Sequence, residues 1–359
     1  MKKIIVSALL FLSVNAFAQK AENIIIITTD GFRWQELFNG MDSAIANDKK
    51  FNQDDSAAIF KNYWSADPVA RRKKLLPFIW SIIESKGQIY GNRNYTNKVN
   101  VANRYWFSYP GYNEIFTGYP DTLVNSNEYK PNPNTTLLDF LNQQDAFKNK
   151  VAAFGAWNAF ERILNRGKSG IPVINAFDTL KDKKATPSQV LLNKMLLDSY
   201  KPFGNAECLD VFTHYAAMDY LQHKKPRVLY ISYGETDEWA HEGRYKDYLD
   251  AAGKVDKWIS DIWNYLQSDP FYKNKTALFI TTDHGRGDSI KKEWTSHNNK
   301  ITGANEIWFA AMGPGIKNKG EIKQSMQLFQ QQFAQTIANW LGVYFSCEHP
   351  VGNKIELNN

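Results

Sequence analysis

The chain has 359 residues, of which 43% are hydrophobic and 22% charged, enough to bury a substantial core. Its net charge is +6 at pH 7, or +4 once Lys2 and Lys3 are set aside, which is mild for this length. The densest positive cluster, at residues 71–74, is typical of a solvated helix start, so a nucleic-acid polymer is not an expected partner. A modest positive charge favours anionic small-molecule substrates.

Residues 1–18 have the order of features found in a cleaved export signal. Lys2 and Lys3 precede an apolar stretch at 4–12, and Ala16-Phe17-Ala18 forms a small-residue cleavage site. The alternative is a buried first strand or helix. The apolar stretch is too short to span a bilayer, and no later run reaches that length. We therefore predict a periplasmic or secreted protein whose mature chain has no integral membrane segment.

Residues 19–359 alternate short apolar strands with longer helical stretches, and no repeat or linker divides them. This alternation predicts a single α/β domain of three layers, α/β/α, with a mostly parallel central sheet whose apolar strands are buried on both faces. The predicted strands lie at residues 24–28, 151–154, 228–233, 278–282 and 307–311. The predicted helices lie at residues 75–86, 135–144, 188–200, 245–266 and 326–341.

Only two cysteines occur, Cys208 and Cys347. In an oxidising compartment they could form one disulfide, or both could remain free and buried. Neither has the neighbours of a metal ligand, and the sequence carries no signal for an oligomeric state.

Acidic and imidazole side chains follow three of the predicted strands. Asp30 comes after the first strand, Asp237 and His241 follow the strand ending near residue 233, and Asp283-His284 follows the strand ending near residue 282. Ligands of open α/β sheets bind outside the carboxyl ends of the strands. We therefore expect these side chains to form one site.

The residue types in this predicted site suit a divalent metal. Of six histidines, His241, His284 and His297 lie beside Asp or in short turn-like segments. Asp and neutral His together favour Zn²⁺ or a similar ion, and the absence of nearby cysteine argues against a purely structural zinc site. Each piece alone has a simpler interpretation: Asp30 could cap the next helix, and Asp283-His284-Gly285 could be an ordinary turn.

A loop entering a short helix is predicted at residues 107–120. Pro110 fits the first helical turn, which places Ser108 near the helix N-terminus, where backbone N–H groups favour an anion. A serine hydroxyl is a weak nucleophile until its proton is removed, and metal coordination can do that. The alternative is that Ser108 is an N-cap.

The order of these motifs resembles the alkaline phosphatase superfamily, most closely its type I phosphodiesterase/nucleotide pyrophosphatase branch. The segment 108–118, S-Y-P-G-Y-N-E-I-F-T-G, is similar to that branch's T-F-P-N-H-Y-T-I-V-T-G, with Ser in place of Thr. Thr282-Asp283-His284-Gly285 is similar to its S-D-H-G. His297 and Gly313-Pro314-Gly315 resemble its terminal histidine and G-P segment. The resemblance runs from about residue 24 to 316.

The resemblance implies a phosphoric ester hydrolase with an alkaline-phosphatase-like fold and two divalent ions about 4 Å apart, Zn²⁺ or alternatively Mn²⁺. Together with the predicted export signal, this gives an exported hydrolase. Ser108 would attack phosphorus and form a phosphoseryl intermediate on a small-molecule phosphate monoester or diester. One ion would be held by Asp237, His241 and His297. The other would be held by Asp30, Asp283, His284 and Ser108.

Further phosphate contacts are expected from the Ser108 backbone N–H and from Asn125 or Asn127, although both asparagines could be plain turn residues. Arg286 could reach a phosphate oxygen, but surface exposure is the favoured interpretation. The branch carries Asn-His where this chain has Gly111-Tyr112, so its substrate preference does not transfer.

Four other functions share parts of this pattern. A sulfatase would need C/S-x-P-x-R, and Tyr112 stands where arginine is required. A phosphoryl or phosphoethanolamine transferase would carry membrane helices, and a phosphosugar mutase would act in the cytosol. A non-catalytic metal-binding protein would keep the fold without turnover. Nearby aromatic residues could stack on a substrate or pack in the core: Trp34, Tyr105, Trp106, Tyr112 and Trp239.

Overall fold

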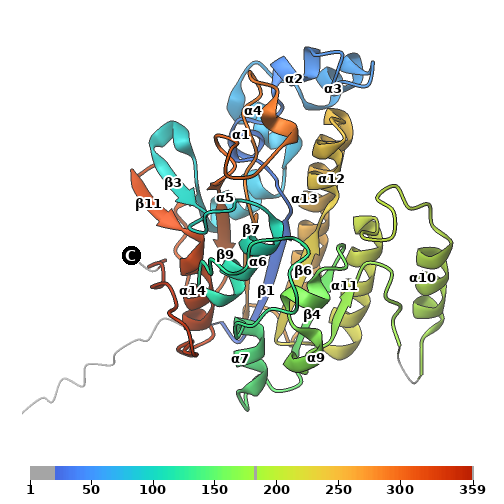
Figure 1. Cartoon of the computed structure of the whole chain (residues 1–359), viewed down its shortest axis with the longest axis vertical. Helices are drawn as coiled ribbons and strands as arrows, with labels where there is room; N and C mark the ends of the chain where they lie inside the picture. The colour runs from blue at the N-terminus through green and yellow to red at the C-terminus, as the bar shows by residue number, and fades with distance from the viewer. Residues whose placement is uncertain (1–20, 182–183, 358–359) are drawn as a thin grey trace, which may run out of the picture.

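The computed structural model describes residues 21–181 and 184–357, and its centre is an eight-stranded sheet (Figure 1). The predicted export signal lies outside the described residues. Across the sheet the strands are β10 (Gly320–Glu321), β2 (Gly87–Tyr90), β9 (Phe309–Met312), β7 (Thr276–Thr281), β1 (Asn23–Thr29), β6 (Val228–Tyr233), β4 (Val151–Gly155) and β5 (Val173–Asn175).

The sheet is mostly parallel, as predicted. The first strand, β1, lies between β6 and β7 and runs parallel to both, while β9 is antiparallel to its two neighbours β7 and β2. Residues 24–27 of β1, four consecutive isoleucines, are completely buried. Isoleucine suits a pleated strand covered on both faces, so the sequence of β1 by itself specifies a central strand.

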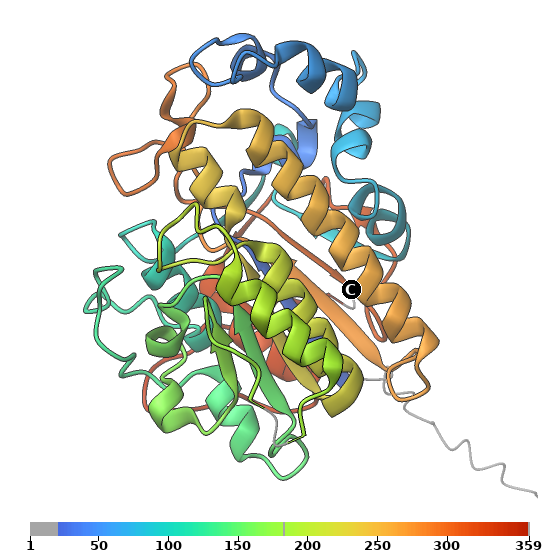
Figure 2. The ribbon, with the colours of Figure 1, turned by 90° about the vertical axis from the view of Figure 1, so that its right-hand side faces the viewer.

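Helices cover both faces of the sheet, which confirms the α/β/α architecture (Figures 1 and 2). Alternate residues of β1 belong to different cores, with Ile24 and Ile26 on one side and Ile25 and Ile27 on the other. The first core is closed by α6 (Ser108–Thr117), α7 (Leu137–Gln143), α8 (Phe160–Ile163) and α14 (Phe333–Trp340). The second is closed mainly by α1 (Trp34–Asn39), the π-helical η1 (Ile79–Ile83), α11 (Asp210–Lys224) and α13 (Tyr245–Ser268).

The predictions at residues 307–311 and 326–341 are partly wrong. The first splits at Trp308 into β8 (Glu306–Ile307) and β9, which belong to different sheets. The second begins with a strand, β11 (Met326–Phe329), and becomes α-helical only at α14. The residues of β11 alternate between half-buried and exposed, the period of a strand, and they pair with β3 (Asn97–Asn100) in a second, three-stranded sheet.

The helix predicted at residues 75–86 is interrupted. Helix α4 (Pro68–Leu75) ends there because Leu76 precedes Pro77 and leaves the helical region, with φ −129° and ψ 69°. The basic cluster 71–74 therefore ends a helix instead of starting one. Arg72 in it is buried, with Nη1 3.0 Å from Glu321 Oε1, so this cluster is only partly solvated.

The helices predicted at residues 135–144, 188–200 and 245–266 are confirmed as α7, α10 (Pro187–Asp198) and α13. Both cysteines are free thiols in the described part of the chain. Within residues 21–181 and 184–357, no helix is long and apolar enough to cross a membrane. The remaining helices are α2 (Ser43–Asn47), α3 (Ser56–Tyr63), α5 (Glu84–Lys86), η2 (Arg93–Tyr95), α9 (Arg166–Ser169), α12 (Glu235–His241), η3 (Glu293–Thr295) and η4 (Gln330–Gln332).

Candidate active site

The predicted ligands meet at the carboxyl edge of the sheet because the strands that deliver them are neighbours. Asp30 directly follows β1, α12 starts two residues after β6, and Asp283 comes two residues after β7. Helix α6 places Ser108 against the same edge, with Oγ 3.3 Å from His284 Nε2. Segments far apart in the sequence thus form one cluster.

Asp30, Asp283 and His284 form what we call the inner group. One ligand atom from each lies within 4.8 Å of the other two, and all three residues are buried. His284 Nε2 is 3.2 Å from Asp30 Oδ1 and 3.4 Å from Asp283 Oδ2. Asp283 Oδ2 is buried and has no hydrogen-bond partner among the described residues. A buried carboxylate oxygen in this state suits a bound cation.

Asp237, His241 and His297 form the outer group. His241 Nε2 lies 3.0 Å from Asp237 Oδ2 and 2.9 Å from His297 Nε2. The Asp237 and His241 side chains are four residues apart in α12 and therefore share one face of this helix. His284 lies between the two groups. Its ring stacks on the ring of His297, with 3.9 Å between the ring centroids. A possible ligand atom of His284 also lies within 4.8 Å of one from Asp237 and one from His297.

The helix that carries Ser108 packs directly on the inner group. A Cβ atom at Gly111 would lie 2.5 Å from the carbonyl oxygen of Asp283, so only glycine permits this approach. One residue later, Tyr112 is buried, and its hydroxyl donates to Asp30 Oδ2 at 2.9 Å. The sequence marked Tyr112 as a nearby aromatic residue and as the replacement of a sulfatase arginine, but not as a partner of Asp30. Its place four residues after Ser108, on the same helix face, was a usable signal for that contact.

The structure separates the two candidate asparagines. Asn127 Oδ1 accepts the backbone N–H of Tyr109 at 3.0 Å, which places its side chain beside the segment that carries Ser108. The Asn127 backbone carbonyl accepts a hydrogen bond from Arg162 Nη2 at 3.2 Å, so Arg162 also fixes the loop that carries Asn127. Asn125 is exposed on the same loop.

The prediction that Arg286 lies on the surface is wrong. Its side chain is completely buried and donates to the carbonyl oxygens of Trp294, at 2.8 Å, and Thr295, at 2.6 Å. Its Nη1 contacts Asp237 Oδ1. Burial is possible because the guanidinium is satisfied by two carbonyls and one carboxylate. Arg286 therefore orients an outer ligand.

The charges differ between the two groups. Burial opposes ionisation of Asp237, but Arg286 and the neighbouring histidines outweigh it and hold the pKa of Asp237 well below its usual range. Burial, together with the Asp30 charge, raises the pKa of Asp283 well above its usual value. Burial lowers the pKa of His284, yet the carboxylates around it, Asp283 foremost, raise that pKa to about 9. Burial and His284 keep the pKa of His297 well below its usual value, although Asp237 acts against them.

Two carboxylates that the sequence did not single out hold α12 in place. Asp210 accepts the N–H groups of Gly234 at 2.7 Å and Glu235 at 3.0 Å, while Glu235 accepts the Asp210 N–H at 2.8 Å. Each acid thus binds backbone N–H groups at the N-terminal end of the other's helix. This reciprocal contact fixes the start of the helix that carries Asp237.

The donor set fits divalent cations. Three carboxylates and three imidazoles converge, and Asp30 Oδ1 is a second buried carboxylate oxygen without a hydrogen-bond partner in the described chain. Mixed nitrogen and oxygen donors of this kind suit zinc and related ions.

The sequence matches the family described as Type I phosphodiesterase / nucleotide pyrophosphatase over residues 38–324, most of the chain. It is also 24% identical over 231 residues to a 2,3-bisphosphoglycerate-independent phosphoglycerate mutase of Ureaplasma urealyticum serovar 10. That alignment covers 63% of this chain but only 40% of the mutase.

Solved structures with similar folds include the alkaline phosphatase PafA, with a TM-score of 0.61, 12% identity and coverage of 94% of this chain and 98% of PafA. A 2-O GAG sulfatase has a TM-score of 0.58 at 14% identity, and the alignment covers 92% of this chain and 72% of the sulfatase chain. The lipoteichoic acid synthase LtaP of Listeria monocytogenes has a TM-score of 0.57 at 14% identity, with coverage of 90% and 73%.

These likenesses agree with the motifs and the fold. The chain belongs to the type I phosphodiesterase/nucleotide pyrophosphatase family of the alkaline phosphatase superfamily.

Proposed function

We propose that the chain is an exported, two-metal phosphoric ester hydrolase with Ser108 as its nucleophile. The observation that carries this proposal is the position of Ser108, at the first turn of α6 with Oγ 3.3 Å from His284 Nε2. A hydroxyl at a helix N-terminus beside a cluster of metal ligands is suited to attack an anionic ester.

Two Zn²⁺ ions, or alternatively Mn²⁺, would occupy the two groups. Asp237, His241 and His297 would hold one, while Asp30, Asp283 and His284, together with Ser108 Oγ, would hold the other. When bound, such ions lower the pKa of the nucleophile and neutralise charge on the transferred group. The carboxylates and imidazoles of this chain set their positions, and Arg286 and Tyr112 orient Asp237 and Asp30.

The chain's own groups account for the remaining steps. Ser108 Oγ forms a bond to phosphorus while the bond to the ester oxygen breaks, and the serine proton passes through solvent to the departing oxygen, giving phosphoserine and the free alcohol. Water then attacks phosphorus and the bond from phosphorus to Ser108 Oγ breaks. The serine oxygen takes up the proton that the water loses, so Ser108 is regenerated and the phosphate product is released. The Ser108 N–H and the Asn127 amide group, which its contact with Tyr109 orients, are positioned to donate to the oxygens of the transferred group. We assign Asn125 no stronger role than a contact from the exposed loop.

The choice of phosphate over sulfate rests on Tyr112. It occupies the position at which a sulfatase motif requires arginine, and its hydroxyl is bonded to Asp30. Intact-mass analysis of the peptide containing Ser108 tests this choice. We expect an unmodified serine, and a formylglycine there would overturn the serine mechanism in favour of sulfate esters.

Rates on an aryl phosphate, an aryl phosphodiester and an aryl sulfate test the activity and define whether monoesters or diesters are preferred. Ser108→Ala should reduce hydrolysis of the phosphate substrates by about a thousandfold or more. Ser260→Ala, on the outer side of α13, is the matched control and should retain full activity. A Ser108→Ala variant with full activity would contradict the proposal. Export is tested separately, by finding Gln19 as the first residue of protein recovered from the periplasm or medium.

A further inference from the structure

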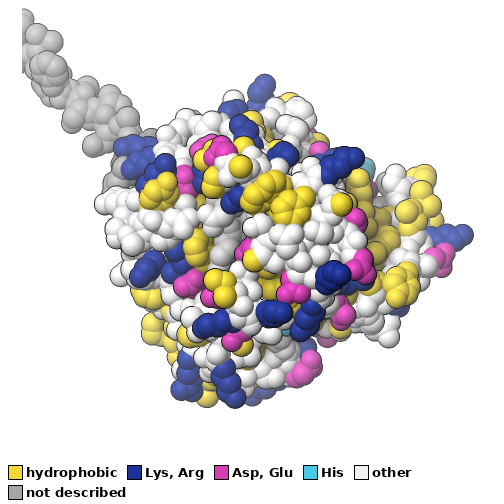
Figure 3. All heavy atoms as spheres, turned by 90° about the horizontal axis from the view of Figure 1, so that it is seen from above, with side chains coloured by type: hydrophobic (Ala, Val, Ile, Leu, Met, Phe, Trp, Pro, Cys, Tyr) yellow, Lys and Arg dark blue, Asp and Glu magenta, His cyan; other side chains and the backbone are white. Residues whose placement is uncertain are grey.

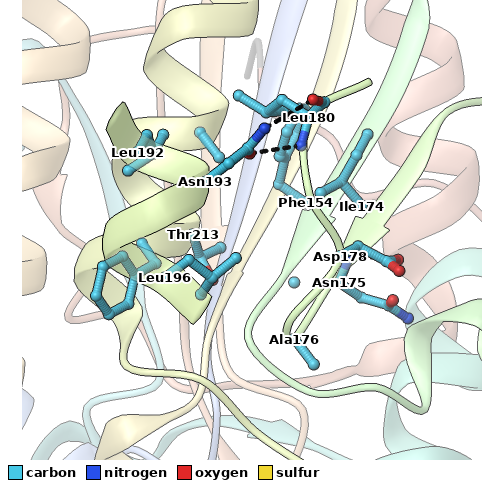
Figure 4. Close-up of a pocket in the computed structure, with 13 residues that line it drawn as sticks. Phe154, Ile174, Asn175, Ala176, Asp178, Leu180, Leu192, Asn193, Leu196 and Thr213 are labelled. Carbon is cyan, nitrogen blue, oxygen red and sulfur yellow. Dashed lines mark hydrogen bonds between the residues drawn. The ribbon is translucent and has the colours of Figure 1, made fainter. Parts of the chain in front are cut away.

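Helix α10 is firmly attached to the molecule through one side. Pro187 occupies its first turn, and Thr186 and Gln189 form a reciprocal capping box, so the helix start is well defined. Asn193 binds both the N–H and the carbonyl of Leu180, at 2.8 and 2.9 Å, as Figure 4 shows. Leu192 and Leu196 of this inner side line a small pocket with Phe154 and Ile174.

The opposite side of α10 faces outward and carries large apolar side chains beside the exposed Lys194 and Asp198. These apolar side chains are more than half exposed, although polar residues are the ordinary choice for a solvent-facing helix surface. We call this set the α10 outer surface: Val190 (56% exposed), Leu191 (58%), Met195 (53%), Leu197 (56%) and Tyr200 (83%). These are five of thirteen exposed large hydrophobic residues in the described chain, within eleven residues of sequence.

The α10 outer surface continues onto α11. Leu191 and Met195 line a groove with Tyr215 and Met218 of that helix, and Tyr215 is itself 53% exposed. The groove has a volume of about 530 Å³. In Figure 1 α10 stands at the margin of the molecule, and Figure 3 shows hydrophobic side chains together with basic and acidic ones on the projecting lobe at the right. A contiguous apolar surface of this kind marks an interaction site.

Charge distinguishes between possible partners. Residues 181–201 include five lysines, Lys181, Lys183, Lys184, Lys194 and Lys201, but only two acids, Asp182 and Asp198. Anionic lipid headgroups would neutralise this excess, whereas two copies meeting through this surface would bring like charges together. Lysine can also bury its aliphatic stem beside the leucines while its ammonium group remains at headgroup level.

We propose that α10 is an interfacial anchor that binds the surface of an anionic lipid bilayer. Its leucines, valine and methionine would enter the headgroup and acyl boundary, and the lysines would contact the lipid phosphates. The inner contacts with Leu180 keep the helix attached to the sheet, so binding requires no unfolding. This role is independent of the chemistry at Ser108.

Sedimentation of the full chain with lipid vesicles tests the anchor. Phosphatidylcholine vesicles containing phosphatidylglycerol should bind the wild type, and pure phosphatidylcholine should bind it more weakly. Replacing Val190, Leu191, Met195 and Leu197 by serine should lower the partition coefficient by about a hundredfold, and Lys184→Glu with Lys194→Glu by about tenfold. All variants share residues 1–20, so differences between them report on α10.

A matched control removes equally exposed apolar side chains elsewhere. Leu123, Ile290 and Tyr344 are 68%, 85% and 76% exposed, and their replacement by serine should leave vesicle binding unchanged. Hydrolysis of a soluble aryl ester should also remain unchanged in the serine variant of α10. Ser108→Ala should bind vesicles like the wild type, which separates failure of the anchor from failure of the proposed enzyme.

An environment-sensitive dye locates the contact. In a Cys347→Ser background, dye on Met195→Cys should shift to shorter emission wavelength with anionic vesicles, while dye on Tyr344→Cys should not. Unchanged vesicle binding by the serine variant of α10, or no shift at position 195, would overturn the proposal. A dimer in sedimentation velocity that the same serine variant abolishes, without vesicle binding, would overturn it in favour of a second copy of the chain.

Discussion

The inner and outer metal groups lie side by side but are built from different backbone. The inner residues stand immediately beyond β1 and β7 at the centre of the sheet, and the His284 side chain is fully buried. The outer residues come from the short helix α12 and from a loop, and the His241 side chain is 43% exposed. The inner carboxylate Asp283 has a raised pKa, whereas Arg286 holds that of Asp237 low.

One edge of a sheet can therefore carry two neighbouring groups that differ in burial and in backbone support. Strand ends fix the inner ligands with little freedom, so we expect that group to bind its ion tightly and release it slowly. Of the outer residues, His241 is accessible to water, and Asp237 depends on Arg286 and on the contact between Asp210 and Glu235 for its position. We therefore expect the outer ion to exchange first when a chelator is added.

The largest expected effect is that of Asp283→Asn. Oδ1 can still accept the Gly31 N–H, now 3.1 Å away, so the fold should persist while the inner ion loses a charged ligand. Ester hydrolysis should fall by about a thousandfold, and metal analysis should find one ion fewer. Asp288→Asn, five residues further on, is the control. Full metal content in Asp283→Asn would show that the inner group is not a metal site.

His241→Ala should have a smaller, reversible effect. Removing the exposed ligand should weaken binding of the outer ion by about a hundredfold, and excess metal should restore much of the activity. His223→Ala is a matched control, because His223 pairs with Asp219 at the same i,i+4 spacing on α11. Equal metal loss in both variants would contradict the assignment.

The two groups should also differ in pH dependence. The pKa of His284 is about 9 without metal, so a metal entering the inner group must displace a proton at neutral pH. Inner affinity should therefore rise with pH, by about tenfold per unit for each proton released, and level off above about pH 9. His297, with its lowered pKa, is already neutral and adds no such dependence. Calorimetry in buffers of different ionisation enthalpy measures the number of protons released on metal binding. Equal proton release from both groups would contradict the predicted difference in their pH dependence.

Arg286→Gln should give the smallest change. Without the guanidinium, the pKa of Asp237 should rise because burial is no longer offset, and a protonated Asp237 is a poorer ligand. Outer-ion affinity should fall by about tenfold, and more at low pH. Arg244→Gln is the control, since Arg244 pairs with Asp247 on the surface. Competition with a metal-sensitive dye measures the outer-ion affinity of each variant. If Arg286→Gln binds the outer ion as tightly as Arg244→Gln, Arg286 does not orient the outer group.

The sequence predicted that Asp30, Asp283 and His284 would meet, because this prediction needs only the positions of the strands that precede these residues. Four consecutive isoleucines identify a central strand, and parallel strands bring the residues after their carboxyl ends to one edge of the sheet. Arg286 was misplaced because its burial depends on two carbonyls, of Trp294 and Thr295, that only the folded loop brings near. Asn125 and Asn127 could not be ranked because loop geometry decides which one reaches Tyr109.

The errors outside the site have a similar origin. Residues 326–329 were assigned to a helix because α14 follows closely, and four residues are too few to establish a period of two. Their strand conformation depends on pairing with β3, more than two hundred residues earlier. Long-range pairing of this kind leaves no signal in a short window.

The contact of Gly111 with the Asp283 carbonyl limits how the candidate site can be re-engineered. Any larger residue at position 111 would push Ser108 away from the inner group, so we expect sequence diversity introduced there to abolish the proposed activity. Libraries aimed at new esters are better directed to the exposed loop around Asn125, where neither metal group depends on the exact backbone. We therefore expect position 111 to tolerate no substitution and the loop around Asn125 to tolerate many.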